Sequence, residues 1–205
     1  MPLEIIQHPL CVHYINKLRD KRTAHLEFRR YCDQVTHFLA AAATADLKVK
    51  PAALDTPLER MEGNLVAEPI VVVAVLRAGA GMIDCVVRLL PEVSVGYIGL
   101  ERNEETAEAR RYYCKFPPLE GRRALVVDPM LATGGSAEQA IAAVIEAGAA
   151  RVDFLCIVAA PEGVRRLEQR FPRVRIFAGA LDRELDTDKY IRPGLGDFGD
   201  RLYGT

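Results

Sequence analysis

The sequence lacks an excess of either charge, a close pair of cysteines and a long apolar segment. A net charge of −1 over 205 residues gives no reason to expect a nucleic acid or a membrane surface as a partner, so any anion must be bound by a local arrangement. The five cysteines are scattered and form no Cys-x-x-Cys motif. This spacing argues against a disulfide scaffold or a zinc ribbon and favours a reduced, cytoplasmic protein.

Two further absences exclude classes of protein and of catalytic site. The longest apolar run of strand type, residues 70–76, is far too short to cross a bilayer, and residues 1–4 do not resemble a signal peptide. The four histidines all lie in the first 37 residues, away from the predicted sheet ends. They are therefore interpreted as surface or packing residues, and neither a Ser-His-Asp nor a Cys-His catalytic arrangement is predicted.

From residue 70 onward, the sequence shows a regular alternation of apolar strands and helical patterns. Strands are predicted at 70–76, 93–100, 125–127, 152–158 and 174–177, and helices at 82–90, 136–147 and 161–171. Such alternation predicts right-handed crossovers and an α/β fold with a mostly parallel central sheet covered by helices on both faces. The length fits a single domain with an N-terminal helical segment and edge (1–68), a core (69–180) and a tail (181–205).

The predictions are less regular before this core. Residues 1–13 are predicted to be irregular, with Pro2 and Pro9 as breakers, and a charged helical pattern follows to about residue 44. Thr23 is a candidate cap for a second helix over 26–43. Residues 46–68 predict an edge strand or hairpin. Pro91 is expected to end the helix over 82–90, and Gly148 the helix over 136–147.

Two segments interrupt the alternation. Residues 101–120 lie between two strands and carry several arginines and a Tyr-Tyr-Cys-Lys-Phe group at 112–116, where no helix fits. We predict a projecting hairpin or flexible arm, which would be a solvated surface, a dimer contact or a cover that closes over a site. The tail 181–205 contains four glycines and one proline, so regular structure is not expected there. A compact domain tolerates such a tail mainly where it builds a site.

One strand–loop–helix segment combines the features of an anion site. The apolar run 125–127 is followed by Asp128, by a loop containing Gly134 and Gly135, and by a helical pattern. The first N–H groups of a helix lack internal partners, and glycines let a phosphate approach the backbone. Asp128 would repel a bare phosphate but accept hydrogen bonds from hydroxyl groups. The segment therefore suits a sugar phosphate, with an ordinary βα turn as the alternative.

A second strand end repeats this pattern with a fixed positive charge. Arg77 follows the strand 70–76 within Leu-Arg-Ala-Gly-Ala-Gly and precedes a predicted helix, so that two strand ends could face one polyanion. The full Gly-x-Gly-x-x-Gly dinucleotide motif is absent here, and the loop before Ser136 has no Walker A lysine. These absences argue against a dinucleotide-binding fold and against an NTPase.

Together these motifs resemble the uracil phosphoribosyltransferases over nearly the whole chain. The matching motifs lie at 8–10, 44–47, 76–79, 102–106, 112–113, 127–136, 159–164 and 193–197. Asp-Pro-Met-Leu-Ala-Thr-Gly-Gly-Ser at 128–136 and Pro-Gly-Leu-Gly-Asp at 193–197 are the most specific. The resemblance implies the phosphoribosyltransferase fold. It also implies transfer of a phosphoribosyl group from 5-phosphoribosyl 1-diphosphate (PRPP) to uracil, giving UMP and pyrophosphate in pyrimidine salvage.

The resemblance further implies a cofactor and partners. Mg²⁺ would be held mainly by PRPP and water, so that no cluster of metal ligands is needed in the chain. The small-molecule partners would be uracil, PRPP, UMP and pyrophosphate, and the enzyme would be a homodimer or homotetramer without nucleic-acid or membrane partners. Some members of the family are activated by GTP, and the sequence leaves that point open.

The resemblance assigns roles to individual residues. Catalytic roles fall on Arg77, Arg102, Asp128 and Asp197. PRPP binding falls on these four and on Pro129, Met130, Leu131, Ala132, Thr133, Gly134, Gly135 and Ser136. Uracil binding falls on Ile191, Gly196, Asp197 and Phe198, mainly through their backbone groups. Within these sets Asp128 would contact the ribose hydroxyls, residues 132–136 the 5′-phosphate, and the two arginines the diphosphate. The peptide bond between Leu76 and Arg77 is expected to be cis.

The chain departs from the family pattern at three positions. Phe198 stands where many members have alanine, Arg192 where an aliphatic residue is usual, and Ala74 where a proline is usual. These changes would make the base pocket bulkier and more charged, so a phosphoribosyltransferase for another base is a second hypothesis. A non-catalytic sensor of PRPP or UMP on the same fold is a third. A generic nucleotide-binding α/β protein is a fourth, and it predicts no role for the tail.

Overall fold

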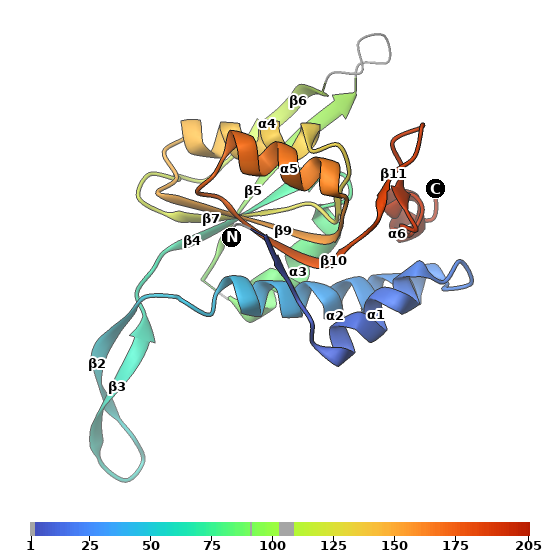
Figure 1. Ribbon diagram of the computed structural model, residues 1–205. Helices are drawn as coiled ribbons and strands as arrows, with labels where there is room; N and C mark the ends of the chain where they lie inside the picture. Colours follow the sequence, from blue (N-terminus) through green and yellow to red (C-terminus); the bar gives the residue numbers. More distant parts are fainter. Residues whose placement is uncertain (1–2, 91, 103–108) are drawn as a thin grey trace.

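The computed structural model of the protein describes residues 3–90, 92–102 and 109–205. Its centre is an eight-stranded sheet in the order β1-β10-β9-β7-β4-β5-β6, with β8 paired to β9 (Figure 1). The pairs are parallel except for β5 with β6. The strands are β1 (Leu3–Ile5), β4 (Ile70–Leu76), β5 (Ser94–Arg102), β6 (Ala109–Lys115), β7 (Arg123–Val127), β8 (Met130–Leu131), β9 (Arg151–Ala159) and β10 (Arg175–Leu181).

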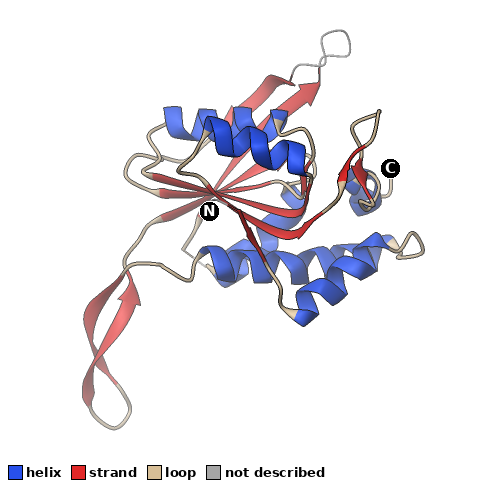
Figure 2. Ribbon diagram, in the orientation of Figure 1, coloured by secondary structure: helices blue, strands red, loops and turns tan. Residues whose placement is uncertain are grey.

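Helices cover both faces of this sheet (Figure 2). One layer contains α1 (Pro9–Arg19), α2 (His25–Ala43) and α3 (Ala80–Leu89), and the other contains α4 (Gly135–Glu146) and α5 (Pro161–Arg170). The prediction of an α/β fold with a mostly parallel sheet is confirmed. The strands and helices predicted from residue 70 to residue 177 are present with shifted ends, and Gly148 ends α4 with φ at 91°. Pro91 lies outside the described residues.

The core follows directly from the apolar strands. Val72 and Leu125 pack with the layer of α1 to α3, whereas Val71 and Val126 pack with α4 and α5. All four side chains have no exposed surface. Because both faces of β4 are covered, its sequence is a continuous apolar run instead of an alternating one.

The N-terminal segment differs from the prediction. Residues 3–5 form β1, which pairs with β10, and Pro9 begins α1 instead of breaking the chain. Proline is tolerated in the first turn of a helix, where its missing N–H would have no partner. His8 caps this helix by accepting a hydrogen bond from the Leu10 N–H at 3.2 Å. Thr23 is not the cap of α2: Ala24 occupies that position, and the Thr23 hydroxyl donates to the Lys17 carbonyl at 2.6 Å.

Two hairpins project from the sheet in Figure 1. Strands β2 (Val49–Asp55) and β3 (Arg60–Val66) form an antiparallel pair apart from the main sheet, which confirms the hairpin expected at 46–68. Strands β5 and β6 form the base of the predicted arm and pair antiparallel, with an irregularity between Gly99 and Leu100. Residues 103–108 of the arm lie outside the described residues.

The tail is more ordered than its glycine content predicts. Two short antiparallel strands, β11 (Glu184–Leu185) and β12 (Ile191–Arg192), precede a short helix, α6 (Phe198–Tyr203). The expectation that glycine and proline prevent regular structure here is therefore wrong. Among the described residues, no helix combines the length and the apolar character needed to cross a membrane.

Candidate active site

The predicted site residues gather where parallel strands end. Arg77 follows β4 and Asp128 follows β7, and these two strands are neighbours in the sheet. Gly79, in the loop that follows β4, lies directly against the end of β7: an added Cβ at this residue would lie 2.4 Å from the Val127 carbonyl oxygen. Only a residue without a side chain allows this approach. The glycine of the Leu-Arg-Ala-Gly motif thus brings the Arg77 loop against the strand that carries Asp128.

Arg102 is the last residue of β5, which pairs with β4 on the side away from β7. Its strand therefore runs parallel to the one that precedes Arg77. The orientation of its side chain lies outside the described part of the structure. The diphosphate role of Arg102 stays a prediction that its place at a strand end supports.

Asp128 has few partners for a partly buried carboxylate. Its Oδ1 accepts one long hydrogen bond, from the Met130 N–H at 3.4 Å. Burial raises the pKa of Asp128 to about 7, and the Met130 N–H opposes this shift. Burial also raises the pKa of the neighbouring Cys156 thiol, with the Asp128 charge as a smaller cause. A carboxylate with so few protein donors retains acceptor capacity for the hydroxyls of a ligand.

The loop after Asp128 leads into the N-terminus of α4. Gly134 precedes this helix with φ at 81°, a conformation that favours glycine, and it makes no side-chain cap bond. The helix thus begins with backbone N–H groups suited to an anion. Pro129 and Leu131 are buried. The Pro129 carbonyl accepts the N–H groups of residues 157 and 158 in β9, and the Leu131 carbonyl accepts that of residue 160, directly after this strand. These two residues hold the loop to the sheet, whereas residues 132–136 form its partly accessible part.

Arg77 lies against the tail. Its guanidinium is 3.8 Å from Asp200, and its carbonyl accepts a hydrogen bond from the Tyr203 hydroxyl at 3.0 Å. A Cβ added at Gly199 would lie 3.3 Å from Asp197 Oδ1 and 3.9 Å from Arg77 Nη2, so Arg77 and Asp197 both come close to this glycine. The peptide bond from Leu76 to Arg77 is cis, as predicted. Asp197 itself caps α6 by accepting the Asp200 N–H at 2.9 Å.

Two arginines fix the tail to the N-terminal helices. Arg19 donates to the buried Asp182 carboxylate at 2.8 Å and to the Gly194 carbonyl at 2.7 Å. Asp182 in turn accepts the Gly194 N–H at 2.8 Å. Arg201 donates to the carbonyls of Leu195 and Asp20 at 2.8 and 2.7 Å. These contacts hold the glycine-rich segment against α1 and the residue that follows this helix.

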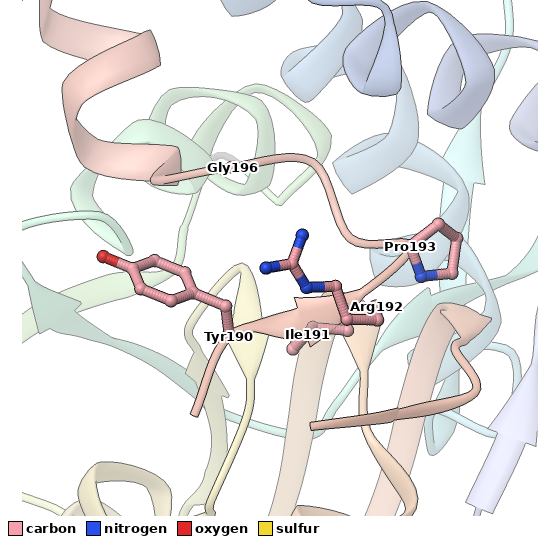
Figure 3. Close-up of a pocket in the computed structure, with 5 residues that line it drawn as sticks. All are labelled: Tyr190, Ile191, Arg192, Pro193 and Gly196. Atoms are coloured by element: carbon pink, nitrogen blue, oxygen red, sulfur yellow. The ribbon is translucent and has the colours of Figure 1, made fainter. Parts of the chain in front are cut away.

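The tail contains a pocket of about 280 Å³ (Figure 3). The residues that line it are Tyr190, Ile191, Arg192, Pro193 and Gly196. Of the predicted uracil-binding residues, Ile191 and Gly196 line the pocket, whereas Asp197 and Phe198 do not. The expectation that Phe198 makes the pocket wall bulkier is wrong. Its ring is 2% exposed and packs edge-on against Phe28 at 5.0 Å, inside the core.

Glu162, in the first turn of α5, lies between the tail and the loop that follows Asp128. Its Oε1 accepts the Leu185 N–H of β11 at 3.2 Å, and its Oε2 is buried without a partner among the described residues. An added Cβ at the next residue, Gly163, would lie 2.5 Å from the Ala132 carbonyl oxygen. The start of α5 therefore contacts both β11 and the loop at residue 132.

Comparison with known proteins gives the relationship of the chain. A model of the family described as uracil phosphoribosyltransferase matches residues 5–205. The chain belongs to the uracil phosphoribosyltransferase family. The uracil phosphoribosyltransferase of Staphylococcus epidermidis is 43% identical over 99% of this chain and 98% of its own length. That of Oceanobacillus iheyensis is 45% identical, over 98% and 97% of the two chains.

Solved structures agree with this relationship. The AQ2163 protein from Aquifex aeolicus is similar with a TM-score of 0.95 and 36% identity, over 99% of this chain and 98% of that one. A hypoxanthine-guanine phosphoribosyltransferase from Bacillus anthracis has a TM-score of 0.53 and 15% identity, over 77% and 80% of the chains. The second likeness shows a shared fold alone. The family relationship favours the uracil branch over the hypotheses of another base, a sensor or a generic nucleotide-binding protein.

The sequence does not point to several residues that the structure places at this candidate site. Tyr190 lines the pocket, and an aromatic residue directly before Ile191 was the available signal. Asp200 and Tyr203 contact Arg77 from 123 or more positions along the chain, so no spacing rule connects them. Glu162 belongs to the matching motif at 159–164, but the motif by itself gave no role for its carboxylate.

Proposed function

We propose that this chain transfers the phosphoribosyl group of PRPP to uracil, forming UMP and releasing pyrophosphate. One observation carries the proposal: the family relationship extends from residue 5 to residue 205, a range that contains the segments to which this chemistry is assigned. Those segments are the cationic strand end at Arg77, the glycine loop after Asp128 and the pocket of the tail. In the fold they converge at the carboxyl edge of one sheet, where α/β proteins bind ligands.

In this reaction the bond between ribose C1 and the diphosphate oxygen breaks, and a bond from C1 to uracil N1 forms. The N1 proton is released to solvent. Positive charge develops on the ribose and negative charge on the leaving diphosphate, so the enzyme must stabilise charge and hold the base in position. Arg77 and Arg102, at the ends of the neighbouring strands β4 and β5, would bind the diphosphate. No nucleophilic side chain is needed.

The ribose end of PRPP would lie at the loop after β7. Asp128, with one long protein hydrogen bond, would accept the ribose hydroxyls. Residues 132–136 at the start of α4 would bind the 5′-phosphate through backbone N–H groups and the Thr133 and Ser136 hydroxyls. Asp197, which like Arg77 lies close to Gly199, would face the PRPP from the tail.

The residues present fit a Mg²⁺ ion that is carried mainly by the substrate. The described residues include no group of three or more His, Cys, Asp or Glu side chains that would enclose a metal. Mg²⁺ retains several waters and readily takes phosphate oxygens as ligands, so a protein needs to supply only one or two carboxylates. Asp128 would supply that carboxylate, directly or through a water. When bound, the ion neutralises charge on the diphosphate.

Uracil would occupy the pocket of the tail. Ile191 and Gly196 line it and offer backbone donors and acceptors to the planar edge of the base. Cytosine carries a reversed donor and acceptor at positions 3 and 4 of its ring, so its binding would leave buried backbone groups unpaired. A site of this kind selects uracil without a dedicated side chain.

The proposal includes a homo-oligomer. The hairpin β2–β3 stands away from the sheet in Figure 1, and a two-stranded hairpin is marginally stable alone in water. Its exposed apolar residues are Val49, Leu58, Met61, Leu65 and Val66. A second copy of the chain that covers these residues would account for both features. Sedimentation velocity tests this: Leu65→Glu should shift the protein towards monomer, and a wild-type monomer would contradict it.

The activity is tested by pyrophosphate release. The protein is incubated with PRPP, Mg²⁺ and each nucleobase in turn, with and without GTP. Release with uracil alone supports the proposal, and higher turnover on adding GTP supports its role as an activator. Release with a different base, or tight binding of UMP without any turnover, would contradict it.

A further inference from the structure

The base pocket contains one charged side chain, Arg192. Figure 3 shows its guanidinium rising from β12 into the space between Tyr190 and the segment that carries Gly196. Ile191, the other residue of this short strand, is buried on the opposite side of it. Successive side chains of a strand alternate between its two faces, so Arg192 is not buried together with Ile191, and its side chain lines the pocket.

Asp186 holds this guanidinium in place. Its Oδ2 accepts from Arg192 Nε at 2.6 Å and also pairs with Nη2. Its Oδ1 accepts the N–H groups of Asp188 and Tyr190 at 3.0 and 2.9 Å, which fixes the turn between β11 and β12. One carboxylate thus shapes the turn with one oxygen and orients Arg192 with the other.

The contact with Asp186 uses only part of the guanidinium. An arginine has five N–H donors, and Nε and Nη2 face Asp186. The Nη1 group has no acceptor within hydrogen-bonding distance in the described part of the chain. A donor held in a fixed position at a pocket wall complements a ligand that presents an oxygen acceptor there.

We propose that Arg192, oriented by Asp186, binds the substrate base by donating from its free Nη1 edge to a keto oxygen of uracil. The inference rests on the proposed function, because it takes the pocket of the tail as the uracil site. As N1 loses its proton during transfer, negative charge spreads to the keto oxygens, and a guanidinium donor interacts more strongly with that charged form. An amino group in place of a keto oxygen would face the guanidinium donor to donor. At position 4, where cytosine has its amino group, Arg192 would thus favour uracil over cytosine in addition to the backbone.

The test combines a variant with altered substrates. Arg192→Met keeps an unbranched apolar stem but removes the guanidinium donors, and 2-thiouracil and 4-thiouracil each replace one keto oxygen by a weaker acceptor. We expect Arg192→Met to raise the KM for uracil about tenfold, with the KM for PRPP changed less than about twofold, because a charged hydrogen bond to the base alone is lost. The wild type should discriminate against the thio analogue at the contacted oxygen, and the variant should lose that discrimination.

Three further variants separate binding from structure. Arg192→Lys retains a charged donor and should restore part of the uracil affinity. Asp186→Asn keeps an oxygen for the Asp188 and Tyr190 N–H groups but loses the second acceptor, so it should raise the KM for uracil by a smaller factor than Arg192→Met. Arg183→Met is the matched control: Arg183 pairs with Glu184 on the same hairpin at 2.9 Å and does not line the pocket, so its uracil kinetics should equal those of the wild type.

The outcomes distinguish the inference from the function. Turnover of uracil by the wild type, together with unchanged uracil KM and unchanged thio discrimination in Arg192→Met, would overturn the inference and leave the function standing. Absence of uracil turnover in the wild type would overturn the function and the inference with it. Arg192 is 56% exposed in its side chain, so the variant is expected to fold, and a thermal melt verifies this.

Discussion

Arginine and aspartate occur at both ends of the parallel strands, in opposite states. The strands begin at the amino edge of the sheet and end at its carboxyl edge. At the amino edge, Arg123 begins β7 with a fully buried side chain, 2.7 Å from the buried Asp153 and 3.0 Å from Asp46. At the carboxyl edge, the Arg77 side chain is 65% exposed and its nearest carboxylate lies at 3.8 Å. Asp128 there accepts one hydrogen bond, at 3.4 Å. The charges at the start of β7 are paired within the protein, whereas Arg77 and Asp128, after the ends of β4 and β7, have capacity left for a ligand.

The amino edge extends this pairing into a network. Arg175 donates to Asp153 at 2.9 Å, and Arg151 donates to Asp46 at 2.8 Å. Buried ionic groups are tolerated only when their partners remain in place. A buried ion pair and a binding site thus contain the same residue types, and they differ in whether the donors and acceptors of those residues are already used within the protein.

The largest effect is expected from breaking the paired edge. Arg123→Met would leave the buried Asp153 with Arg175 at 2.9 Å and Arg151 at 3.5 Å as its partners, and removing one member of a buried pair costs about 3–5 kcal/mol of unfolding free energy. Because Asp153 keeps other arginine partners, the expected loss of unfolding free energy is about 3 kcal/mol. Urea denaturation measures it, and kcat per folded molecule should stay near that of the wild type.

The neighbouring residue provides a control for this variant. Arg122 is partly exposed and makes one long contact, with Ser94 at 3.4 Å. Arg122→Met should therefore change the unfolding free energy by less than about 0.5 kcal/mol. Equal destabilisation by the two variants would mean that the buried ion pairs contribute no more to the unfolding free energy than an exposed arginine does.

The second effect concerns the unpaired edge. Asp128→Asn should lower kcat/KM for PRPP by about 100-fold or more, because it weakens two charge-assisted hydrogen bonds to the ribose hydroxyls. It should leave the melting temperature unchanged or higher, since it removes a partly buried carboxylate with few protein donors. Steady-state kinetics and a thermal melt measure the two quantities.

Asp84→Asn is a suitable comparison for that variant, because Asp84 is exposed on α3. Its kinetics should match the wild type. Unchanged PRPP kinetics in Asp128→Asn would mean that the ribose assignment is wrong. A large loss of stability would mean that Asp128 stabilises the fold through partners within the protein, as Asp153 does.

Much of the fold could be predicted because local rules and burial agree. The run from Ile70 to Leu76 could only be a strand buried on both faces, and the alternation that follows determines a parallel sheet. The errors fell where one local rule was applied without its exception. The breaker rule for Pro9 overlooks that proline also starts helices, and the capping rule for Thr23 overlooks that its hydroxyl can donate elsewhere, here to the Lys17 carbonyl.

The site was predicted in part for the same reason. Motifs contiguous in sequence, such as 128–136, were found because strand, loop and helix follow one another there. The contacts of Arg77 with Asp200 and Tyr203, and of Asp186 with Arg192, depend on how the tail folds back, and the glycine-rich tail was expected to be irregular. Phe198 was expected in the pocket because the sequence gives no sign of Phe28 as its packing partner.

The third effect is a pH dependence of the unpaired edge. The pKa of Asp128 is raised from 3.8 to about 7 by burial, so the folded free enzyme is partly protonated near neutrality. Since the ionised form accepts the ribose hydroxyls, kcat/KM for PRPP should rise as the pH rises through 7, with a slope of about tenfold per unit on the acid side. Asp128→Asn should lack this step in its residual activity.

The same pKa has a consequence for stability with a defined sign. A carboxyl whose folded pKa lies above its ordinary value contributes stability that is fully present below pH 3.8 and is lost as the pH rises through about 7. The difference in melting temperature between Asp128→Asn and the wild type should therefore grow in favour of the variant between these values. A constant difference across this range would place the folded pKa of Asp128 near its ordinary value.

The smallest effect is expected from the loose contact between Arg77 and Asp200. Both side chains are more than half exposed and 3.8 Å apart, and exposed pairs of this kind contribute about 0.5 kcal/mol or less. Asp200→Asn keeps the oxygen that accepts the Thr205 hydroxyl at 3.2 Å but removes the charge that competes for Arg77. The KM for PRPP should fall by about twofold or less, and the difference should vanish at high salt, where exposed charges are screened. A tenfold rise in this KM would instead mean that Asp200 contacts the substrate, and the unpaired edge would then contain a further binding carboxylate.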